Sequence, residues 1–244
     1  MINQDIKDIS VELWRNSIPH ISIDSVVFGF LNNQLNVLLL KMKEEENWIL
    51  PGGYLQKDES IDGAAKRILY ERSGADKIFL NNFCVFGDLN RSEQYFKDYP
   101  DDLWHKQRFI TIGYYALVDQ TKVNPVPDNF TDRCEWMPVN ALPRLVMDHE
   151  TIIKKALSTL REQISYKPIG YNLLPEAFTL PELQGLYEAI LGEKLNRGNF
   201  YRKMMRYDIL IKLDEQRRGG AYKAPDLYKF DEAKYKKALG GLNW

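Results

Sequence analysis

The sequence predicts an α+β protein, in which a mixed sheet between helices is followed by a small helical domain with a β-hairpin. Two observations predict this class. Over the first two-thirds of the chain, short runs rich in β-branched and aromatic residues alternate with only two stretches of helical period. Over the last third, two helix-start signals precede a hairpin pattern. A chain of 244 residues has room for two domains.

The first part begins with two strands, at residues 21–30 and 35–42, joined by the turn residues Asn32 and Asn33. The remaining predicted elements are a helix at 61–73, strands at 83–88, 109–118 and 135–139, and a helix at 149–163. This order of strands with two helices predicts a mixed-sheet α/β/α sandwich.

The boundary between the two domains is predicted near residue 165. Residues 166–175 contain two prolines that interrupt helical continuation, which is typical of a linker. Thr179 and Glu182 then match a capping box, and the apolar residues that follow recur at helical spacing until Gly192. We therefore predict domains at 1–165 and 166–244.

The C-terminal domain has the elements of a winged helix-turn-helix. Asn196 is suited to cap a second helix that runs to about residue 207, and its Phe200 and Met204 are spaced to face the core. Residues 209–230 follow as a hairpin with a basic, glycine-containing tip. The two helices and the hairpin predict a DNA-binding fold with a wing.

The charge distribution favours the same partner. Residues 166–244 carry 14 Lys and Arg against 10 Asp and Glu, a net charge of +4, whereas the rest of the chain has a net charge of −5. A basic domain favours an anionic partner, here double-stranded DNA. We assign Asn199, Arg202 and Arg206 to base edges or nearby phosphates, and Arg197, Lys203, Arg217 and Arg218 to phosphates. The alternative is a protein-interaction module with a solvated basic helix.

A third pattern lies around the first predicted helix. Gly53 is followed after five residues by Glu59 and after seven more by Arg67, and then come Leu69, Glu71 and Gly74. This spacing closely resembles the Nudix box, G-x5-E-x7-R-E-U-x-E-E-x-G-U, where U is apolar. In Nudix enzymes the box forms a loop, a helix and a loop that present glutamates to Mg²⁺ bound to a diphosphate substrate.

Two carboxylates of the box are replaced, by Ile68 and Arg72. On a helix these positions share a face with Glu71, and the three side chains sum to a formal charge of 0 where the Nudix box has −3. Mg²⁺ needs oxygen ligands, usually carboxylates. We therefore predict no catalytic residues, no metal site, no cofactor and no hydrolase activity. The alternative is an active or weakly active hydrolase that uses Glu59 and Glu71.

The connection between Arg91 and Arg108 is unusually long for a strand-to-strand loop. Either it is a disordered excursion, or its aromatic side chains pack against a ligand pocket or a partner subunit. Those side chains are Tyr95, Phe96, Tyr99 and Trp104.

Together the two halves resemble the NrtR family, the Nudix-related transcriptional regulators, over about residues 21–230. The segments that carry the resemblance are residues 48–53, the degenerate box, and residues 86–91, 147–149, 174–184 and 199–203. The resemblance implies a homodimeric repressor or activator whose Nudix domain senses an effector. In some members the effector is ADP-ribose and the target is NAD synthesis. In others it is a pentose such as arabinose and the target is pentose catabolism.

Because Ile68 and Arg72 weaken diphosphate recognition, we favour a small sugar such as L-arabinose as effector, and genes of sugar catabolism as targets. ADP-ribose and NAD metabolism are the alternative. The fold that the resemblance implies places the effector-binding candidates, which are Asp24, Lys41, Trp48, Tyr54, Glu71, His105 and Arg108.

The remaining expectations concern location and assembly. The chain has no secretory signal and no apolar run near the roughly 20 residues of a membrane span. Cys84 and Cys134 are its only cysteines, and reduced thiols are expected. We expect a cytoplasmic protein with no membrane partner. Effector binding is expected to change the relative placement of two winged helices in a homodimer on a pseudo-palindromic operator.

Overall fold

The computed structural model describes residues 20–43, 45–74, 79–92, 94–98, 104, 107–123, 131–216 and 225–239. Its N-terminal part is built on one mixed sheet of seven strands. These strands are β1 (Ile21–Leu31), β2 (Gln34–Met42), β3 (Trp48–Ile49), β4 (Gly52–Tyr54), β5 (Phe79–Phe86), β6 (Ile110–Val118) and β7 (Thr131–Pro138).

The sheet is ordered β3-β2-β1-β6-β5, with β4 paired to β1 and β7 paired to β2. β1 runs parallel to β6, in a register that extends from the pair Ile21 and Ile110 to the pair Gly29 and Val118. The other pairings in this sheet are antiparallel. A short 3-10 turn, η2 (Gln120–Lys122), follows β6. The predicted mixed sheet is confirmed.

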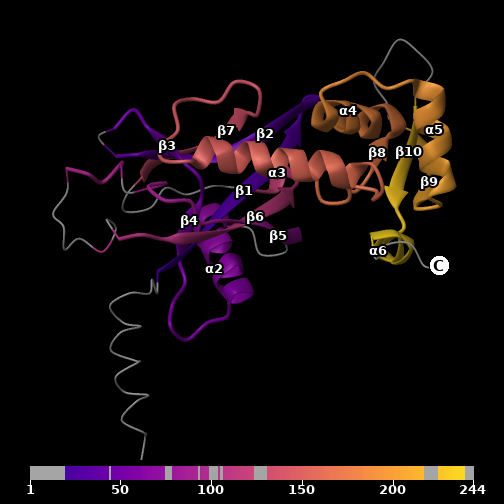
Figure 1. Ribbon diagram of the computed structural model, residues 1–244. Coiled ribbons are helices and arrows are strands. Elements are labelled where there is room, and N and C mark those ends of the chain that lie inside the picture. Colours follow the sequence, from indigo (N-terminus) through magenta and orange to yellow (C-terminus); the bar gives the residue numbers. More distant parts are fainter. Residues whose placement is uncertain are drawn as a thin grey trace, which may run out of the picture.

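Helices α2 (Ile61–Ser73) and α3 (His149–Ile164) cover opposite faces of the sheet (Figure 1). The alternation of side chains along β1 explains this layering. Ile23 packs with Ala65 and Ile68 of α2, whereas Phe28 belongs to the cluster that contains Ile152 of α3. The α/β/α sandwich predicted from the sequence is therefore present.

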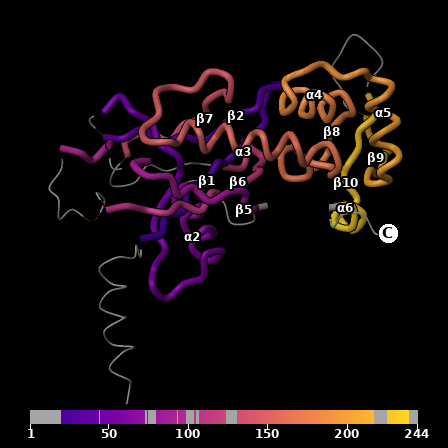
Figure 2. Tube along the Cα trace, in the orientation of Figure 1, coloured from indigo at the N-terminus to yellow at the C-terminus, as the bar shows by residue number. Residues whose placement is uncertain are grey.

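The C-terminal part contains α4 (Leu180–Leu191), α5 (Arg197–Arg206), α6 (Glu232–Leu239) and a three-stranded sheet. The strands are β8 (Phe178–Thr179), β9 (Leu210–Gln216) and β10 (Asp226–Phe230), in the order β8-β10-β9. Figure 2 shows these elements gathered at one end of the molecule, where α3 ends. Two helices followed by a β9–β10 ribbon give the predicted winged helix-turn-helix.

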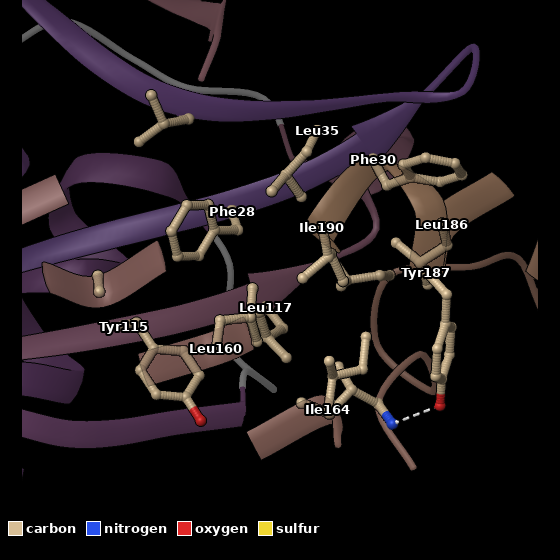
Figure 3. Close-up of a cluster of buried hydrophobic side chains, with 14 of the residues drawn as sticks. Phe28, Phe30, Leu35, Tyr115, Leu117, Leu160, Ile164, Leu186, Tyr187 and Ile190 are labelled. Carbon is tan, nitrogen blue, oxygen red and sulfur yellow. Dashed lines mark hydrogen bonds between the residues drawn. The ribbon is translucent and has the colours of Figure 1, made fainter. Parts of the chain in front are cut away.

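One hydrophobic core crosses the junction between the two parts (Figure 3). Phe30 and Leu35, from the β1–β2 hairpin, belong to the same buried cluster as Leu186 and Ile190 of α4. Figure 3 also shows Tyr187, whose hydroxyl accepts a hydrogen bond from the backbone N–H of Ile169 at 3.1 Å. The first helix of the helix-turn-helix is thus packed directly on the sheet of the N-terminal domain.

The structure differs from the predicted elements at a few places. β5 begins at Phe79, four residues before its prediction, because the polar Asn81 and Asn82 within the strand hide its start. β7 begins at Thr131 and not at residue 135, since its first half is mostly exposed and reads as loop. Helix α6 was not predicted. It is short and charged, and Tyr235 is its one buried hydrophobic residue among those described.

Among the described residues, no helix combines the length and the apolarity that crossing a bilayer needs.

Candidate functional site: a degenerate Nudix box, a buried polar network and a basic helix

The Nudix-like segment folds into β4, a loop and α2. Ser60 caps α2, and its hydroxyl accepts a hydrogen bond from the backbone N–H of Gly63 at 3.1 Å. Gly74 ends the helix in the left-handed region, at φ 68°, and its N–H donates to the carbonyl of Tyr70. Glycine suits this position because a side chain would be strained there. The loop and helix expected from the box are present.

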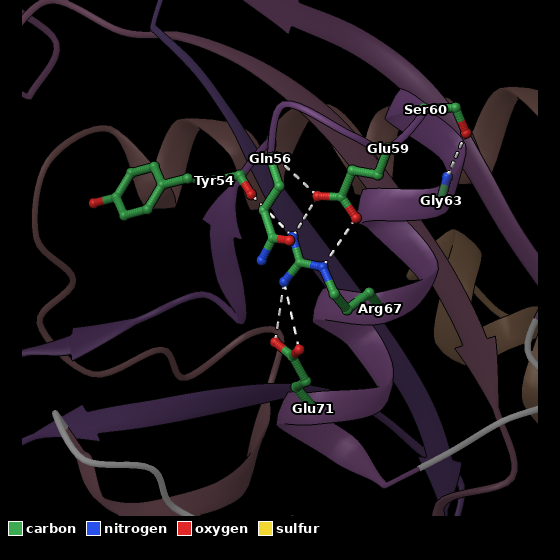
Figure 4. A network of polar contacts seen from close by, with 7 residues as sticks. All are labelled: Tyr54, Gln56, Glu59, Ser60, Gly63, Arg67 and Glu71. Atoms are coloured by element: carbon green, nitrogen blue, oxygen red, sulfur yellow. Dashed lines mark hydrogen bonds and ion pairs between the residues drawn. The ribbon is translucent and has the colours of Figure 1, made fainter.

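Arg67 binds both carboxylates that the box retains (Figure 4). Its Nε and Nη2 donate to Glu59 at 3.0 and 2.6 Å, and its Nη1 donates to Glu71 at 3.2 Å. Nη2 also donates to the backbone carbonyl of Tyr54 at 3.0 Å. One guanidinium therefore ties the end of β4 to the loop and to α2. Arg67 and Glu59 thus form an ion pair, with Nη2 2.6 Å from Oε1.

The electrostatics of Glu59 follow from these contacts. Hydrogen bonds from Arg67, and then from the backbone N–H of Gln56, lower the pKa of Glu59 to about 2. The carboxylate is therefore ionised, and both of its oxygens accept hydrogen bonds from within the protein. These bonds stabilise the loop that holds Glu59.

Ile68 stands at a carboxylate position of the box and faces the core. It is 1% exposed and packs with Ile23, Ala64 and Tyr114. A Cβ added to Gly53 would lie 3.0 Å from Ile68 Cγ1, so the β4 backbone rests directly on this side chain. Positions 68, 71 and 72 follow the helical spacing of α2, but their environments differ, since Glu71 is half exposed and Ile68 is buried.

Arg72 is half-buried near the end of α2. Burial lowers the pKa of Arg72, and the neighbouring Glu71 and Cys134 oppose that shift. Burial likewise raises the pKa of the Cys134 thiol to about 12. A cation, a buried isoleucine and an arginine-bound glutamate do not fit a divalent metal. No group of three or more His, Cys, Asp or Glu suited to a metal occurs within the described part of the chain.

A buried polar network lies on the face of the sheet opposite α2. Asp24 of β1 is buried, and its Oδ2 lies 3.9 Å from Arg91 Nη2. Arg91 donates two hydrogen bonds to Asp148, both at 2.8 Å, and a third to the Thr111 hydroxyl. A Cβ on Gly52 would lie 2.4 Å from Asp24 Oδ1, so this glycine leaves room for the carboxylate.

His149, the first residue of α3, completes the network. The backbone N–H of Leu50 donates to its Nδ1 at 3.0 Å, so the neutral ring carries its proton on Nε2. Burial lowers the pKa of His149, while the charge of Asp24 opposes this shift. Burial also raises the pKa of Asp24, and His149 and Arg91 oppose that shift. Buried titratable groups whose pKa values are shifted by burial and by neighbouring charges cluster at functional sites.

An aromatic cluster adjoins the network at the start of β1. Tyr54 is 38% exposed and Trp104 is 43% exposed, and their rings meet edge to face with centroids 4.4 Å apart. Phe109 lies 4.7 Å from Trp104 and 5.1 Å from His20, measured between ring centroids. Trp104, from the long loop, therefore packs against the sheet. Partly exposed aromatic rings beside buried polar groups are typical of a ligand site.

The predicted effector residues are only partly brought together. Asp24 and Tyr54 lie on neighbouring strands and share a face, because Ser22 pairs with Tyr54 and Asp24 with Gly52. Trp48 instead lies in the hydrophobic core, and Glu71 is bound by Arg67 on α2.

The other candidates are more scattered. Lys41 is half-buried on β2 and lies 3.5 Å from Glu46. Arg108 donates to the carbonyl of Gly87 at 2.9 Å. His105 lies outside the described residues. The predicted effector residues do not include the network partners Arg91, Thr111, Asp148 and His149, although the segments 86–91 and 147–149 carry the resemblance to the NrtR family.

Two loop aromatics can also be placed. The hydroxyl of Tyr95 contacts the carboxylate of Glu45 at 2.8 Å, and the rings of Tyr95 and Phe96 meet edge to face. Tyr99 lies outside the described residues. The described aromatic side chains of this loop thus contact other residues of the protein.

The helix-turn-helix is capped as its sequence predicts. The Thr179 side chain accepts from the backbone N–H of Glu182, and the Glu182 carboxylate accepts from the backbone N–H of Thr179. Gly192 ends α4 at φ 78°, and the side chain of Asn196 caps α5 through the N–H of Asn199. These caps fix where α5 begins.

Helix α5 buries one face and exposes the other. Phe200 and Met204 are buried, whereas Arg197, Asn199, Arg202 and Arg206 are exposed. Arg202 Nη2 donates to Asn199 Oδ1 at 2.5 Å, so these two side chains form one polar unit. Lys203 is half-buried, and its ammonium donates to the carbonyl of Ser165 at 3.3 Å. Arg217 and Arg218 lie outside the described residues.

Two parts of the sequence match known domain families. The NUDIX domain profile matches residues 22–156, and the profile of the NrtR DNA-binding winged helix domain matches residues 170–230. Fold and domains therefore define a DNA-binding transcriptional regulator that carries a NUDIX domain. The chain belongs to the NUDIX domain family, and it is homologous to the NrtR repressors.

Individual relatives agree with this placement. The chain is 27% identical over 219 residues to the ADPR responsive transcriptional repressor NtrR of Acinetobacter baylyi, which covers 87% of this chain and 82% of that protein. The crystal structure of Shewanella oneidensis NrtR complexed with a 27mer DNA matches with a TM-score of 0.72 and 26% identity, over 88% of this chain and 95% of that one.

A MutT/nudix family protein from Enterococcus faecalis also matches, with a TM-score of 0.65 at 17% identity, over 93% of each chain. At this identity the match shows the fold alone. The predicted α+β fold, the DNA-binding domain and the NrtR resemblance are thus confirmed. Nothing in these similarities supports the predicted pentose-responsive lineage, and the alternative, ADP-ribose, agrees better with the Acinetobacter relative.

Proposed function

We propose that this protein is an effector-responsive transcriptional regulator whose NUDIX domain binds its effector without hydrolysing it. The observation that carries the proposal is that Arg67 binds both Glu59 and Glu71, while Ile68, at a former carboxylate position, is buried. The box still folds as a loop, a helix and a loop, and its remaining carboxylates stabilise that structure. Hydrolysis of a diphosphate relies on metal to neutralise charge and activate water. The donor set here does not fit that metal.

The effector we propose is ADP-ribose, which makes the protein a regulator of NAD metabolism. Support comes from the Acinetobacter relative, a repressor responsive to ADPR that matches 87% of this chain. The network around Asp24 and Arg91 and the aromatic pair Tyr54 and Trp104 form the face where we place the effector. Its polar groups suit ribose hydroxyls and its rings suit a base.

A pentose such as L-arabinose is the second candidate, with sugar catabolism as its target. One observation favours it. The loss of the metal site removes the usual bridge to a diphosphate, while a neutral sugar needs only convergent hydrogen-bonding groups and an aromatic face. Buried Asp24 and exposed Tyr54 offer both.

The DNA-binding surface we propose is the exposed side of α5. Asn199, Arg202 and Arg206 read base edges in the major groove, and Arg197 contacts phosphate. Arg217 and Arg218 are proposed as phosphate contacts of the wing. Lys203 keeps that role in the proposal, although its ammonium also caps the end of α3. A homodimer would place two such helices on a pseudo-palindromic operator.

Isothermal titration calorimetry with ADP-ribose, L-arabinose and D-xylose tests the effector. Heat with ADP-ribose alone supports the first proposal, and heat with a pentose alone supports the second. Chromatography of the calorimeter sample after the titration should show that the ADP-ribose is intact. Binding of neither class, by a protein that binds DNA, would contradict the assignment of the NUDIX domain as a sensor of these ligands.

A further inference from the structure

The tip of the β1–β2 hairpin meets the first helix of the helix-turn-helix at Gly185. Asn32 and Asn33 form the turn, and both lie in the left-handed region, at φ 51° and 59°. A Cβ added to Gly185 of α4 would lie only 2.5 Å from Asn33 Oδ1 and 3.3 Å from its Cγ. The amide of Asn33 therefore rests on the bare backbone of α4, where any larger residue would push it away.

This glycine is unusual in its place. Gly185 lies in the middle of α4, where alanine has the higher helix propensity. Its neighbours Leu186 and Ile190 are fully buried against the hairpin, in the cluster that includes Phe30. The helix thus has an apolar seat on the NUDIX domain, and the contact between Asn33 and Gly185 lies at the edge of that seat.

The contact borders a hollow that gives α4 room for a small shift if the contact is lost. A hollow of about 510 Å³ is lined by Asn33, Gln184, Gly185, Glu188 and Arg197, among others. It extends from the hairpin tip to the first residue of α5. Removal of the Asn33 side chain would enlarge this hollow, and α4 could then tilt into it together with the helix that presents Arg197.

β1 joins this contact to the buried polar network. Asp24 lies near the start of the strand and Asn33 follows its end. β1 pairs with β6 as far as Gly29, and on its other side it pairs with β4 up to Asp24 and with β2 from Phe28 to Leu31. A strand held on both sides transmits a small displacement along its length better than a loop does.

We propose that Asn33 is a positioning residue for DNA binding. Through Gly185 it sets the placement of α4, and thereby of the recognition helix α5, relative to the NUDIX domain. It also transmits effector binding at the face around Asp24 to helix α5, and this part of the inference rests on the proposed function. Asn33 itself contacts neither DNA nor effector.

A double-mutant cycle tests the contact, with Asn33→Gly, Gly185→Ala and the double variant. Glycine tolerates the left-handed turn, so Asn33→Gly removes only the side chain. Asn32→Gly is the matched control, because Asn32 shares the left-handed turn and does not line the contact. The DNA probe is a duplex selected by the wild-type protein from a randomised library, and a scrambled duplex of equal length reports non-specific binding.

We expect each single variant to weaken binding of the selected duplex about tenfold, with the scrambled duplex unchanged. The double variant should match Asn33→Gly within about twofold, because the new Cβ enters the space that the amide vacates. Asn32→Gly should bind like the wild type. A merely structural role would lower the unfolding temperature of Asn33→Gly and leave its affinity for the selected duplex intact.

Independent, additive effects of the two substitutions would overturn the proposal, as would equal affinities of Asn33→Gly and wild type. Transmission is tested separately, by the change in duplex affinity that saturating ADP-ribose causes. That change should shrink at least threefold in Asn33→Gly. If the wild type shows no response to ADP-ribose, the proposed effector is wrong, while the cycle without effector still decides the positioning role.

Discussion

Arg67 and Glu59 form a two-point ion pair, with Nη2 2.6 Å from Oε1 and Nε 3.0 Å from Oε2. The pair joins the middle of α2 to the loop that precedes it. Its geometry is the fork-to-fork contact that a guanidinium makes and an ammonium cannot. Glu71 extends the pair along the helix. The charged side chains that the box retains therefore bind one another and stabilise the loop and helix that carry them.

Replacement of Arg67 by lysine tests this structural role. Lysine keeps the charge but not the fork, so we expect Arg67→Lys to lower the unfolding temperature nearly as much as Arg67→Ala does. Differential scanning fluorimetry makes the measurement. Equal stability of Arg67→Lys and wild type would show that simple charge neutralisation is sufficient.

The same pair predicts a pH dependence. The pKa of Glu59 falls from 4.5 to about 2 on folding, so its contribution to stability is complete above pH 4.5 and is lost as the pH falls towards 2. In Glu59→Gln this contribution is absent at every pH. The free energy of unfolding of the variant should therefore depend less on pH in that window. Urea titrations between pH 2.5 and 5 measure it, and parallel curves for both proteins would contradict the prediction.

The burial of Ile68 predicts that restoring a glutamate at this position lowers the free energy of unfolding. Ile68→Ala should lower the free energy of unfolding by about 2–5 kcal/mol, as expected for a buried isoleucine. Gly53→Ala should cost about 1–3 kcal/mol in the wild type through overpacking, and much less in the Ile68→Ala background. Ile68→Glu should be the least stable variant, because it buries a charge. A stable Ile68→Glu protein that binds Mg²⁺ would show that the position accepts a metal ligand.

Helix α5 predicts the DNA contacts. Arg202→Ala and Asn199→Ala should each weaken operator binding by about 1–3 kcal/mol, and less than additively together, because their side chains are bonded to each other. Lys154→Ala is the charge-matched control, since Lys154 is exposed on α3 and paired with Glu150. Fluorescence anisotropy measures the affinities. A loss of equal size in Lys154→Ala would indicate a general effect of charge.

Arg197 should act on phosphate alone. Arg197→Ala is therefore expected to weaken operator and scrambled duplexes alike, and to reduce the slope of log K against log salt by about 1. An unchanged slope with a loss confined to the operator would move Arg197 into the group that reads bases.

A substitution at Asp24 should affect effector affinity and protein stability differently. Its raised pKa means that folding disfavours the ionised carboxyl, so the stability that Asp24 contributes at low pH is lost as the pH rises. Asp24→Asn removes the buried charge, and we expect the variant to be at least as stable as the wild type at pH 8. Its effector affinity should nevertheless fall at least tenfold, in calorimetry with Asp132→Asn, an exposed position on β7, as control. Unchanged affinity would remove Asp24 from the effector site.

The sequence predicted local structure well where one residue type determines it. Gly192 and Asn196 mark helix ends through backbone conformation and capping, which depend on near neighbours. The strand at residues 21–30 was predictable because its residues are buried on both faces of a covered sheet. Helix α6 was missed because one buried tyrosine gives too weak a pattern.

The site was less predictable because its members come from separate segments. Asp24, Arg91 and Asp148 meet only after β1, the loop before β6 and the start of α3 are assembled. Trp48 is predicted to line the effector site, but β3 pairs with β2 and the Trp48 side chain lies in the hydrophobic core. Local spacing carries no information about such long-range contacts. The same holds for the meeting of Asn33 and Gly185.

The most direct measurement follows operator release and effector integrity in one sample. The protein is bound to its fluorescent operator, and ADP-ribose is added with Mg²⁺ while anisotropy and nucleotide composition are recorded. We predict that the operator affinity changes and that ADP-ribose remains uncleaved after many equivalents have been exchanged. Steady formation of AMP and ribose 5-phosphate by the wild type, lost in Glu59→Gln, would contradict a sensor that binds without hydrolysis.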